Sequence, residues 1–173
     1  YYMGMIGILS MIRPYLVDKG YGMKEIGFLM GVVGTAASFV MAWFSGVFIR
    51  RIGIHKARII IAGLIILAPL YFLAMTFTNF NKTAFVFGII YIQACYGLAT
   101  VVLYTASMQQ VRPGREGTDF TIQIVISHVS GLLVAVLAGI VAHLFTYRGL
   151  YIAEGMVSIV SFCYVLIAFR RRK

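Results

Sequence analysis

Polar side chains recur at helical spacing along an otherwise apolar stretch, residues 84–111. Their steps of three and four place them on one face of an α-helix. Amide and hydroxyl groups donate and accept hydrogen bonds, so this face could hold the polar groups of an organic solute. A polar face on a membrane helix is expected toward a bundle interior or a water-filled cavity. The residues predicted to line such a cavity are Gln93, Tyr96, Thr100 and Tyr104. Anchoring at the membrane interface is the alternative, and it accounts for Tyr104 alone.

Three further side chains are candidates for contact with a solute. His128 lies nine residues after Asp119, about 13 Å along a helix that rises 1.5 Å per residue. A histidine at that depth, with Gln123 about one turn before it, suits substrate or proton binding. A neutral histidine bonded to a neighbouring helix is an equally good interpretation. Arg13 precedes Pro14 and either contacts a substrate carboxylate or extends toward lipid headgroups.

Charged residues gather in one short stretch, RPGREGTDFTIQ at 112–123. A Pro-Gly pair commonly ends a helix and turns the chain. The oxygen of Thr118 or Asp119 could then accept from free N–H groups where the next helix begins, and an acid there favours the helix dipole. The sequence predicts a capped turn, with Arg112, Arg115 and Glu116 paired with one another or with a neighbouring loop.

The elements that must position these residues are long apolar runs. The chain has 173 residues, of which 61% are hydrophobic and 12% charged, whereas about a quarter of a soluble domain is charged. Runs of about twenty apolar residues can cross a hydrocarbon core about 30 Å thick. We predict an all-α integral membrane protein, a bundle of six transmembrane helices. They are expected at residues 1–17, 26–49, 57–78, 84–111, 119–146 and 149–169. Because the first run opens at Tyr1 inside apolar sequence, we expect the chain to be a piece of a longer protein.

The basic residues are unevenly distributed, which predicts the topology. The net charge is +10, and ten of the fifteen Lys and Arg residues lie in three segments, 50–58, 112–115 and 170–173. These segments share one side if six helices alternate, and the positive-inside rule makes that side cytoplasmic. The carboxyl terminus is therefore predicted to be cytoplasmic. The charge sets topology, and no nucleic-acid partner is expected.

No group of residues predicts catalysis, a metal or a cofactor. The three histidines, at 55, 128 and 143, are far apart along the chain, and Cys95 and Cys163 lack metal-ligand spacing. We therefore predict no enzyme activity. Glu154 is the one acid in the last apolar run. The favoured interpretation makes it structural, with Arg148 or Lys82 as its partner, and the alternative is a proton carrier.

Two stretches resemble the major facilitator superfamily. GTDFTIQ, at 117–123, follows a basic turn and is similar to the subgroup of muropeptide permeases and siderophore importers of the rhizobactin and pyochelin type. SGVFIRRIGIHKAR, at 45–58, resembles the second copy of that family's G-x-x-x-D-R-x-G-R loop. Gly46, Arg51 and Gly53 match the loop, and Arg50 stands in place of its acid. The resemblance implies the carboxyl-terminal six helices of a twelve-helix fold, with the amino-terminal half absent.

The resemblance also implies roles for these segments. The first and fourth helices would line a central cavity, and the second and fifth would meet the amino-terminal half. Cytoplasmic gates would include Arg50, Arg51, Arg112, Arg115, Glu116 and Asp119. The expected protein is a bacterial inner-membrane transporter in contact with lipid, moving an amphipathic siderophore-like or muropeptide-like solute by alternating access with proton coupling. The alternative is a stand-alone six-helix substrate-binding subunit of a multi-protein transporter.

Overall fold

The computed structural model describes residues 3–77 and 82–170, with backbone only for 168–170. These residues are almost entirely helical and contain no strand. The helices are α1 (Met3–Asp18), α2 (Met23–Gly27), the π-helical segment η1 (Phe28–Gly34), α3 (Thr35–Ile52), α4 (Ile54–Phe77), α5 (Lys82–Met108) and α6 (Glu116–Arg170). The all-α prediction is confirmed.

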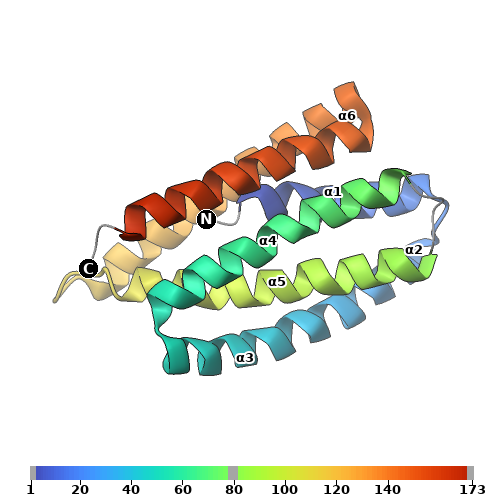
Figure 1. Ribbon diagram of the computed structural model, residues 1–173. Coiled ribbons are helices and arrows are strands. Elements are labelled where there is room, and N and C mark those ends of the chain that lie inside the picture. The colour runs from blue at the N-terminus through green and yellow to red at the C-terminus, as the bar shows by residue number, and fades with distance from the viewer. Residues whose placement is uncertain (1–2, 78–81, 171–173) are drawn as a thin grey trace.

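Four stretches of the described chain are long and apolar enough to cross a membrane. They are Met23–Ile52, Ile54–Phe77, Lys82–Met108 and Glu116–Ile167. The last contains a kink at Thr146, where φ is 62° and ψ is 174°, and Figure 1 shows its two arms lying alongside each other. The structure thus offers a helical segment for each expected span, but α1 has only 16 residues. Six crossings stay a prediction.

The helix boundaries differ from those expected around the charged turn. We expected the fourth helix to reach residue 111 and the fifth to begin at 119, but α5 ends at Met108 and α6 begins at Glu116. At the end of α5 the Gln110 N–H donates to the Ser107 carbonyl, a tightened turn that closes many helices. Gly114 has a φ of 81°, a left-handed conformation that glycine adopts without strain.

A second difference lies in the expected helix 26–49. Its first part is the π-helical segment η1, which carries Gly31 and Gly34. A Cβ at Gly34 would lie 3.0 Å from Nε2 of Gln93, so the glycine allows α5 to approach η1 closely. The sequence pattern of small residues indicated close packing but contained no sign of the wider helical turn.

Glycines set the two closest helix contacts. A Cβ at Gly97 of α5 would lie 2.9 Å from the carbonyl carbon of Ser38 in α3, and the Ser45 hydroxyl of α3 donates to the Leu98 carbonyl over 3.0 Å. In α1, Cβ atoms at Gly4 and Gly7 would overlap the second arm of α6. Backbones approach this closely in lipid when the interface is built of small residues. The bundle therefore contains two close pairs, α3 with α5 and α1 with α6.

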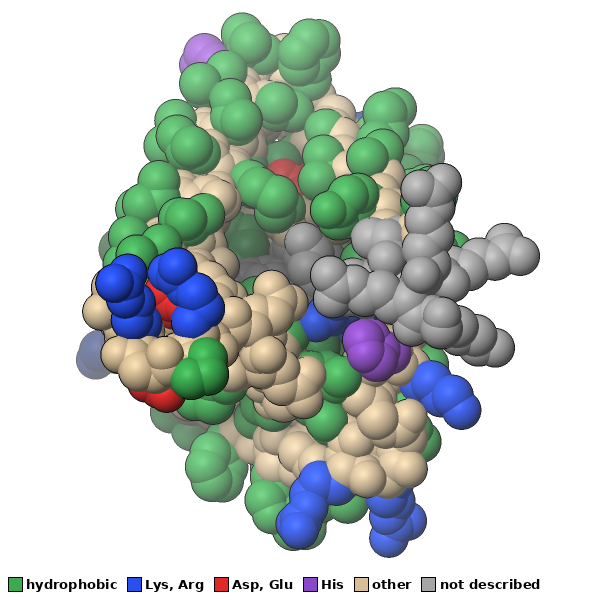
Figure 2. Space-filling view, turned by 90° about the vertical axis from the view of Figure 1, so that its left-hand side faces the viewer, with side chains coloured by type: hydrophobic (Ala, Val, Ile, Leu, Met, Phe, Trp, Pro, Cys, Tyr) green, Lys and Arg blue, Asp and Glu red, His purple; other side chains and the backbone are tan. Residues whose placement is uncertain are grey.

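The basic loops gather at one end of the bundle, which we call the basic end. The α3–α4 junction and the loop 109–115 both lie there (Figure 1). Figure 2 looks onto this end, where Lys and Arg side chains lie around the rim and hydrophobic side chains cover the flanks. This arrangement fits helices in lipid with charged ends in water. The expected basic tail at 171–173 lies outside the described residues.

Side-chain hydrogen bonds tie helices together at the opposite end. The Tyr147 hydroxyl donates to Oδ2 of Asp18 over 2.5 Å, and Arg148 donates to the Thr76 carbonyl over 2.9 Å. These bonds join α6, just after its kink, to the ends of α1 and α4.

Candidate functional site

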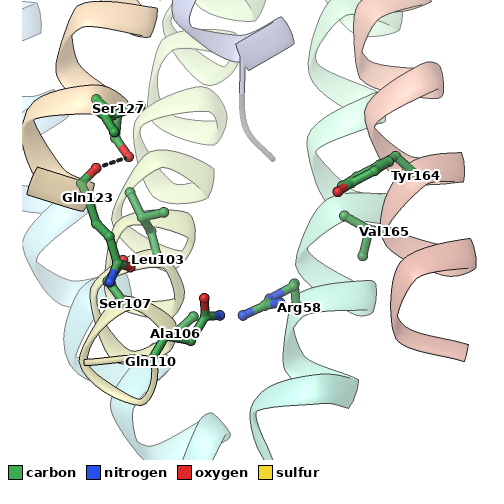
Figure 3. Close-up of a pocket in the computed structure, with 10 residues that line it drawn as sticks. Arg58, Leu103, Ala106, Ser107, Gln110, Gln123, Ser127, Tyr164 and Val165 are labelled. Atoms are coloured by element: carbon green, nitrogen blue, oxygen red, sulfur yellow. Dashed lines mark hydrogen bonds between the residues drawn. The ribbon is translucent and has the colours of Figure 1, made fainter. Parts of the chain in front are cut away.

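A cleft opens between α5 and the two arms of α6, with α4 as its remaining wall. Its volume is about 350 Å³, within the range of about 300–1,000 Å³ typical of small-molecule sites. α5 and α6 touch little along this seam, which leaves the space open. The polar side chains on its walls are Arg58, Ser107, Gln110, Gln123, Ser127 and Tyr164. Figure 3 shows the apolar Leu103, Ala106 and Val165 between them.

Arg58 is the buried cation of this cleft. It lies one turn into α4 and is 9% exposed. In Figure 3 its guanidinium points toward the amide of Gln110, across the opening. An arginine presents several N–H donors in a rigid planar fork suited to carboxylates and other planar anions. The cleft can therefore accept a solute with an anionic or strongly hydrogen-bond-accepting group.

The wall formed by α6 is shaped by one local hydrogen bond. The Ser127 hydroxyl donates to the backbone carbonyl of Gln123 over 2.9 Å, drawn in Figure 3. Because this bond uses the backbone oxygen, the side-chain amide of Gln123 keeps its own donors and acceptor. Gln123 was predicted to contact solute, and the structure places it on the wall of this cleft.

A smaller hollow continues the cleft toward α1. Its volume is about 160 Å³, and Leu103, Ile126 and Ser127 line both spaces. Met3 and Ile6 of α1 form its far wall. The position of α1 therefore contributes to the shape of the space beside the cleft.

The predicted polar stripe of α5 is half-buried, and its members have different surroundings. Gln93 lies against Gly34 of η1, and the Thr100 hydroxyl donates to the Tyr96 carbonyl of its own helix over 2.8 Å. The Tyr104 ring packs edge-on against Phe120 at the start of α6, with centroids 6.2 Å apart. None of these four lines the cleft, whose α5 residues are Leu103, Ala106 and Ser107.

His128 and Arg13 lie apart from the cleft. His128 is exposed, and its Nδ1 lies 2.9 Å from the Ile124 carbonyl of the same helix. Since a carbonyl only accepts, this contact requires the proton on Nδ1. The histidine thus bonds to its own helix rather than to a neighbouring one. Arg13 is exposed on α1.

The charged turn at the basic end is closed by one ion pair. Arg112 donates from Nε and from a terminal guanidinium nitrogen to the two carboxylate oxygens of Asp119, over 2.8 and 2.7 Å. Its backbone N–H also reaches Asp119, over 3.1 Å. Asp119 therefore accepts from Arg112 and does not cap the free N–H groups of α6, because the helix has already begun at Glu116. The Glu116 carboxylate accepts from the Gly114 N–H over 2.9 Å.

Asp119 precedes the uncharged run 120–147 and so lies outside the apolar part of α6. Its bonds from the Arg112 side chain and backbone lower the pKa of this carboxyl to about 2. The same pair raises the pKa of the Arg112 guanidinium. Both groups are therefore charged at neutral pH. Within the described ranges, 3–77 and 82–170, no hydrogen bond or ion pair joins Arg112, Arg115 or Asp119 to Arg50 or Arg51.

Glu154 has neither of the partners expected for a structural role. Arg148 donates to the Thr76 carbonyl, and Lys82 lies 3.5 Å from Glu25. The structural interpretation therefore lacks the ion pair on which it depended. Glu154 is 5% exposed.

No model of a known protein family matches the sequence. Sequence reasoning missed Arg58, Gln110 and Ser127 as cleft residues. Ser107 is the next polar residue of the predicted α5 stripe, and it is the member of that stripe that lines the cleft. The basic loop contains Arg58, which was a weak signal. What could not be read from the sequence is that α4 turns Arg58 inward, toward Gln110.

Proposed function

We propose that the chain is the carboxyl-terminal half of a secondary transporter of the major facilitator superfamily in a bacterial inner membrane. It moves an amphipathic organic solute, siderophore-like or muropeptide-like, by alternating access coupled to protons. The observation that carries the proposal is the polar cleft at the basic end of a bundle whose helices are long and apolar enough to cross a membrane. A polar cleft that opens at the charged end of membrane-long helices suits the mouth of a solute pathway.

The chemistry of the cleft supports this solute class. Arg58 supplies a buried positive charge, the Gln110 and Gln123 amides supply neutral donors and acceptors, and Leu103 and Val165 supply apolar surface. A solute with an anionic group, several polar groups and an apolar part would use all three. Both siderophore-like and muropeptide-like molecules have this composition. The charged turn at Arg112 and Asp119 acts as the gate that changes partners as the halves rock.

The test is uptake into vesicles that contain the native protein, with an iron-loaded siderophore and a muropeptide as radiolabelled probes. We expect the wild type to concentrate one of them when a proton gradient is imposed and to stop when a protonophore is added. Gln110→Ala should weaken uptake about tenfold, because a lost hydrogen bond to a charged or strongly polar group costs roughly 1.5 kcal/mol.

Gln109→Ala is the matched control, since Gln109 is the exposed neighbour of Gln110 and does not line the cleft. Equal loss in the two variants would show that the cleft is not the solute pathway. Absence of gradient-driven uptake for both probes would refute this transport function.

A further inference from the structure

One acid lies buried within the bundle without a partner. Glu154 is on the second arm of α6, and its Oε2 has no hydrogen-bond partner. Ser158, one turn later and 3% exposed, also has an unpartnered hydroxyl. Native proteins bond nearly all buried polar groups, so each exception calls for an explanation. These two unpartnered groups lie one turn apart on the same helix face, and nothing else described so far explains them.

The facing surface on α1 is built of glycine. A Cβ at Gly7 would overlap the Glu154 carboxyl, and one at Gly4 would overlap the Ser158 hydroxyl. The Cβ at Gly7 would also meet Ala138 of the first arm of α6 at 3.1 Å. These glycines make room for the polar side chains but give them no hydrogen-bonding side chain in return. The carboxyl is therefore enclosed by apolar atoms as long as α1 is docked.

No basic side chain compensates a charge on Glu154. Within the described part of the chain, no Lys, Arg or His forms an ion pair or hydrogen bond with it. Besides Glu154, the buried titratable side chains of α1 and the second arm of α6 are Tyr151, which stacks on Phe72 of α4, and Tyr15, which stacks on Phe85. Both are neutral phenols at neutral pH. The charged or titratable Arg13 and Asp18 of α1 and His143 and Arg148 of α6 are exposed, and Tyr147 donates to Asp18. An isolated buried carboxylate is so costly that the group takes up a proton instead.

We propose that Glu154 is a proton-binding site whose occupancy depends on whether α1 is docked against the second arm of α6. In the docked state the carboxyl is protonated. When α1 moves away and water enters, the carboxyl releases one proton to water and becomes a carboxylate. Since protonation and docking favour each other, each shifts the equilibrium of the other by the same factor.

α1 connects this site to the cleft. Gly4 and Gly7 face Glu154 and Ser158, while Met3 and Ile6 of the same helix line the hollow beside the cleft. Undocking of α1 would therefore change the shape of the solute pathway at the moment the proton leaves. This coupling to solute movement rests on the transport function proposed above, whereas proton binding itself does not.

The experiment follows the proton directly, in the native protein reconstituted in lipid. Infrared difference spectra recorded while pH is raised should show a carboxylic-acid carbonyl band that disappears in the wild type and is absent in Glu154→Gln. Hydrogen exchange of α1 should increase with pH in the wild type and not in Glu154→Gln, whose neutral amide cannot ionise. Glu25→Gln, which removes an exposed acid, should behave like the wild type in both measurements.

Gly7→Ala gives an independent test. Its added methyl pushes α1 away from the carboxyl, admits water and should lower the pH at which the band disappears. An unchanged band in Glu154→Gln, or a wild-type band that persists until the protein unfolds, would overturn the proposal. Because no solute is used, a positive result together with absent solute uptake would reject the transport function and leave the proton site in place.

Discussion

Replacing Gly97 with alanine tests whether α3 and α5 form the rigid pair that supports the cleft. The new Cβ would overlap the carbonyl oxygen of Ser38 and would lie 2.9 Å from its carbonyl carbon and 3.0 Å from its Cα. Non-bonded carbon atoms in optimal contact are about 3.5–4.0 Å apart, so α3 must move away by roughly 1 Å. The obstructing atoms are backbone, and no side-chain rotation can relieve the overlap.

The expected cost follows from two opposing effects. Overpacking a well-packed interior costs about 1–3 kcal/mol, and a backbone obstacle favours the upper half of that range. Alanine recovers roughly 1 kcal/mol of helix propensity relative to glycine. The net destabilisation should be about 1–2 kcal/mol, a change of about 5–30-fold in the folding equilibrium. Ser45→Ala, which removes the hydrogen bond to Leu98, should cost only about 0.6 kcal/mol, the average for hydrogen bonds between membrane helices.

The assay is equilibrium unfolding in mixed micelles with increasing denaturing detergent. Gly63→Ala is the control, because Gly63 lies mid-helix in α4 and its Cβ would meet only the Phe162 ring, at an ordinary 3.8 Å. It should be neutral or slightly stabilising. If Gly97→Ala proves as stable as Gly63→Ala, the close approach of α3 and α5 described here is wrong.

Two further predictions concern charged residues outside the cleft. Asp119→Asn should slow solute uptake with little change in equilibrium solute binding, because the substitution removes the negative charge that holds Arg112. Both quantities are measured at matched expression. In the wild type the Arg112–Asp119 ion pair is lost only as pH falls through about 2, so the pair keeps its charges near neutral pH. Full activity of Asp119→Asn would reject the gate. His128→Gln should keep expression and fold but lose concentrative uptake or shift its pH dependence, because Nδ1 bonds to the Ile124 carbonyl and leaves Nε2 of this exposed ring for contact with solute; unchanged uptake across pH would assign His128 to a structural role.

The sequence predicted the class of fold because its strongest signals are local. Apolar runs identify helices that lipid requires to satisfy their own backbone groups, and Pro113 and Gly114 mark the turn between α5 and α6 correctly. Between the helices expected at 119–146 and 149–169, the chain breaks at one residue, Thr146, and the helix resumes at once. Arg148 and Gly149 marked this break in the sequence, but they did not predict that it would be so short.

The candidate site was harder to predict because it combines four segments that are distant along the chain. Arg58 belongs by sequence to a basic loop that sets topology, and only the rotation of α4 turns it toward Gln110. Gln123 was predicted because it lies about one turn before His128, although His128 itself lies apart from the cleft. For Glu154 the sequence supplied the residue and its expected partners, but whether Arg148 or Lys82 can reach it depends on packing. Both of those side chains find other acceptors.

The position of the cleft follows from how the bundle divides. Glycine contacts hold α3 to α5 and α1 to α6, whereas α5 and α6 touch little along the seam between them. Because α4 packs on both α5 and α6, this seam can widen without breaking either pair only if α4 moves with one of them as a rigid body. The polar side chains lie along that seam, and the buried acid lies inside one pair. Solute binding in the cleft would then respond to relative motion of the two pairs. Proton binding at Glu154 would respond to loosening of α1 from the second arm of α6. Since α1 lies against Glu154 and also lines the hollow beside the cleft, its displacement would act on both sites at once.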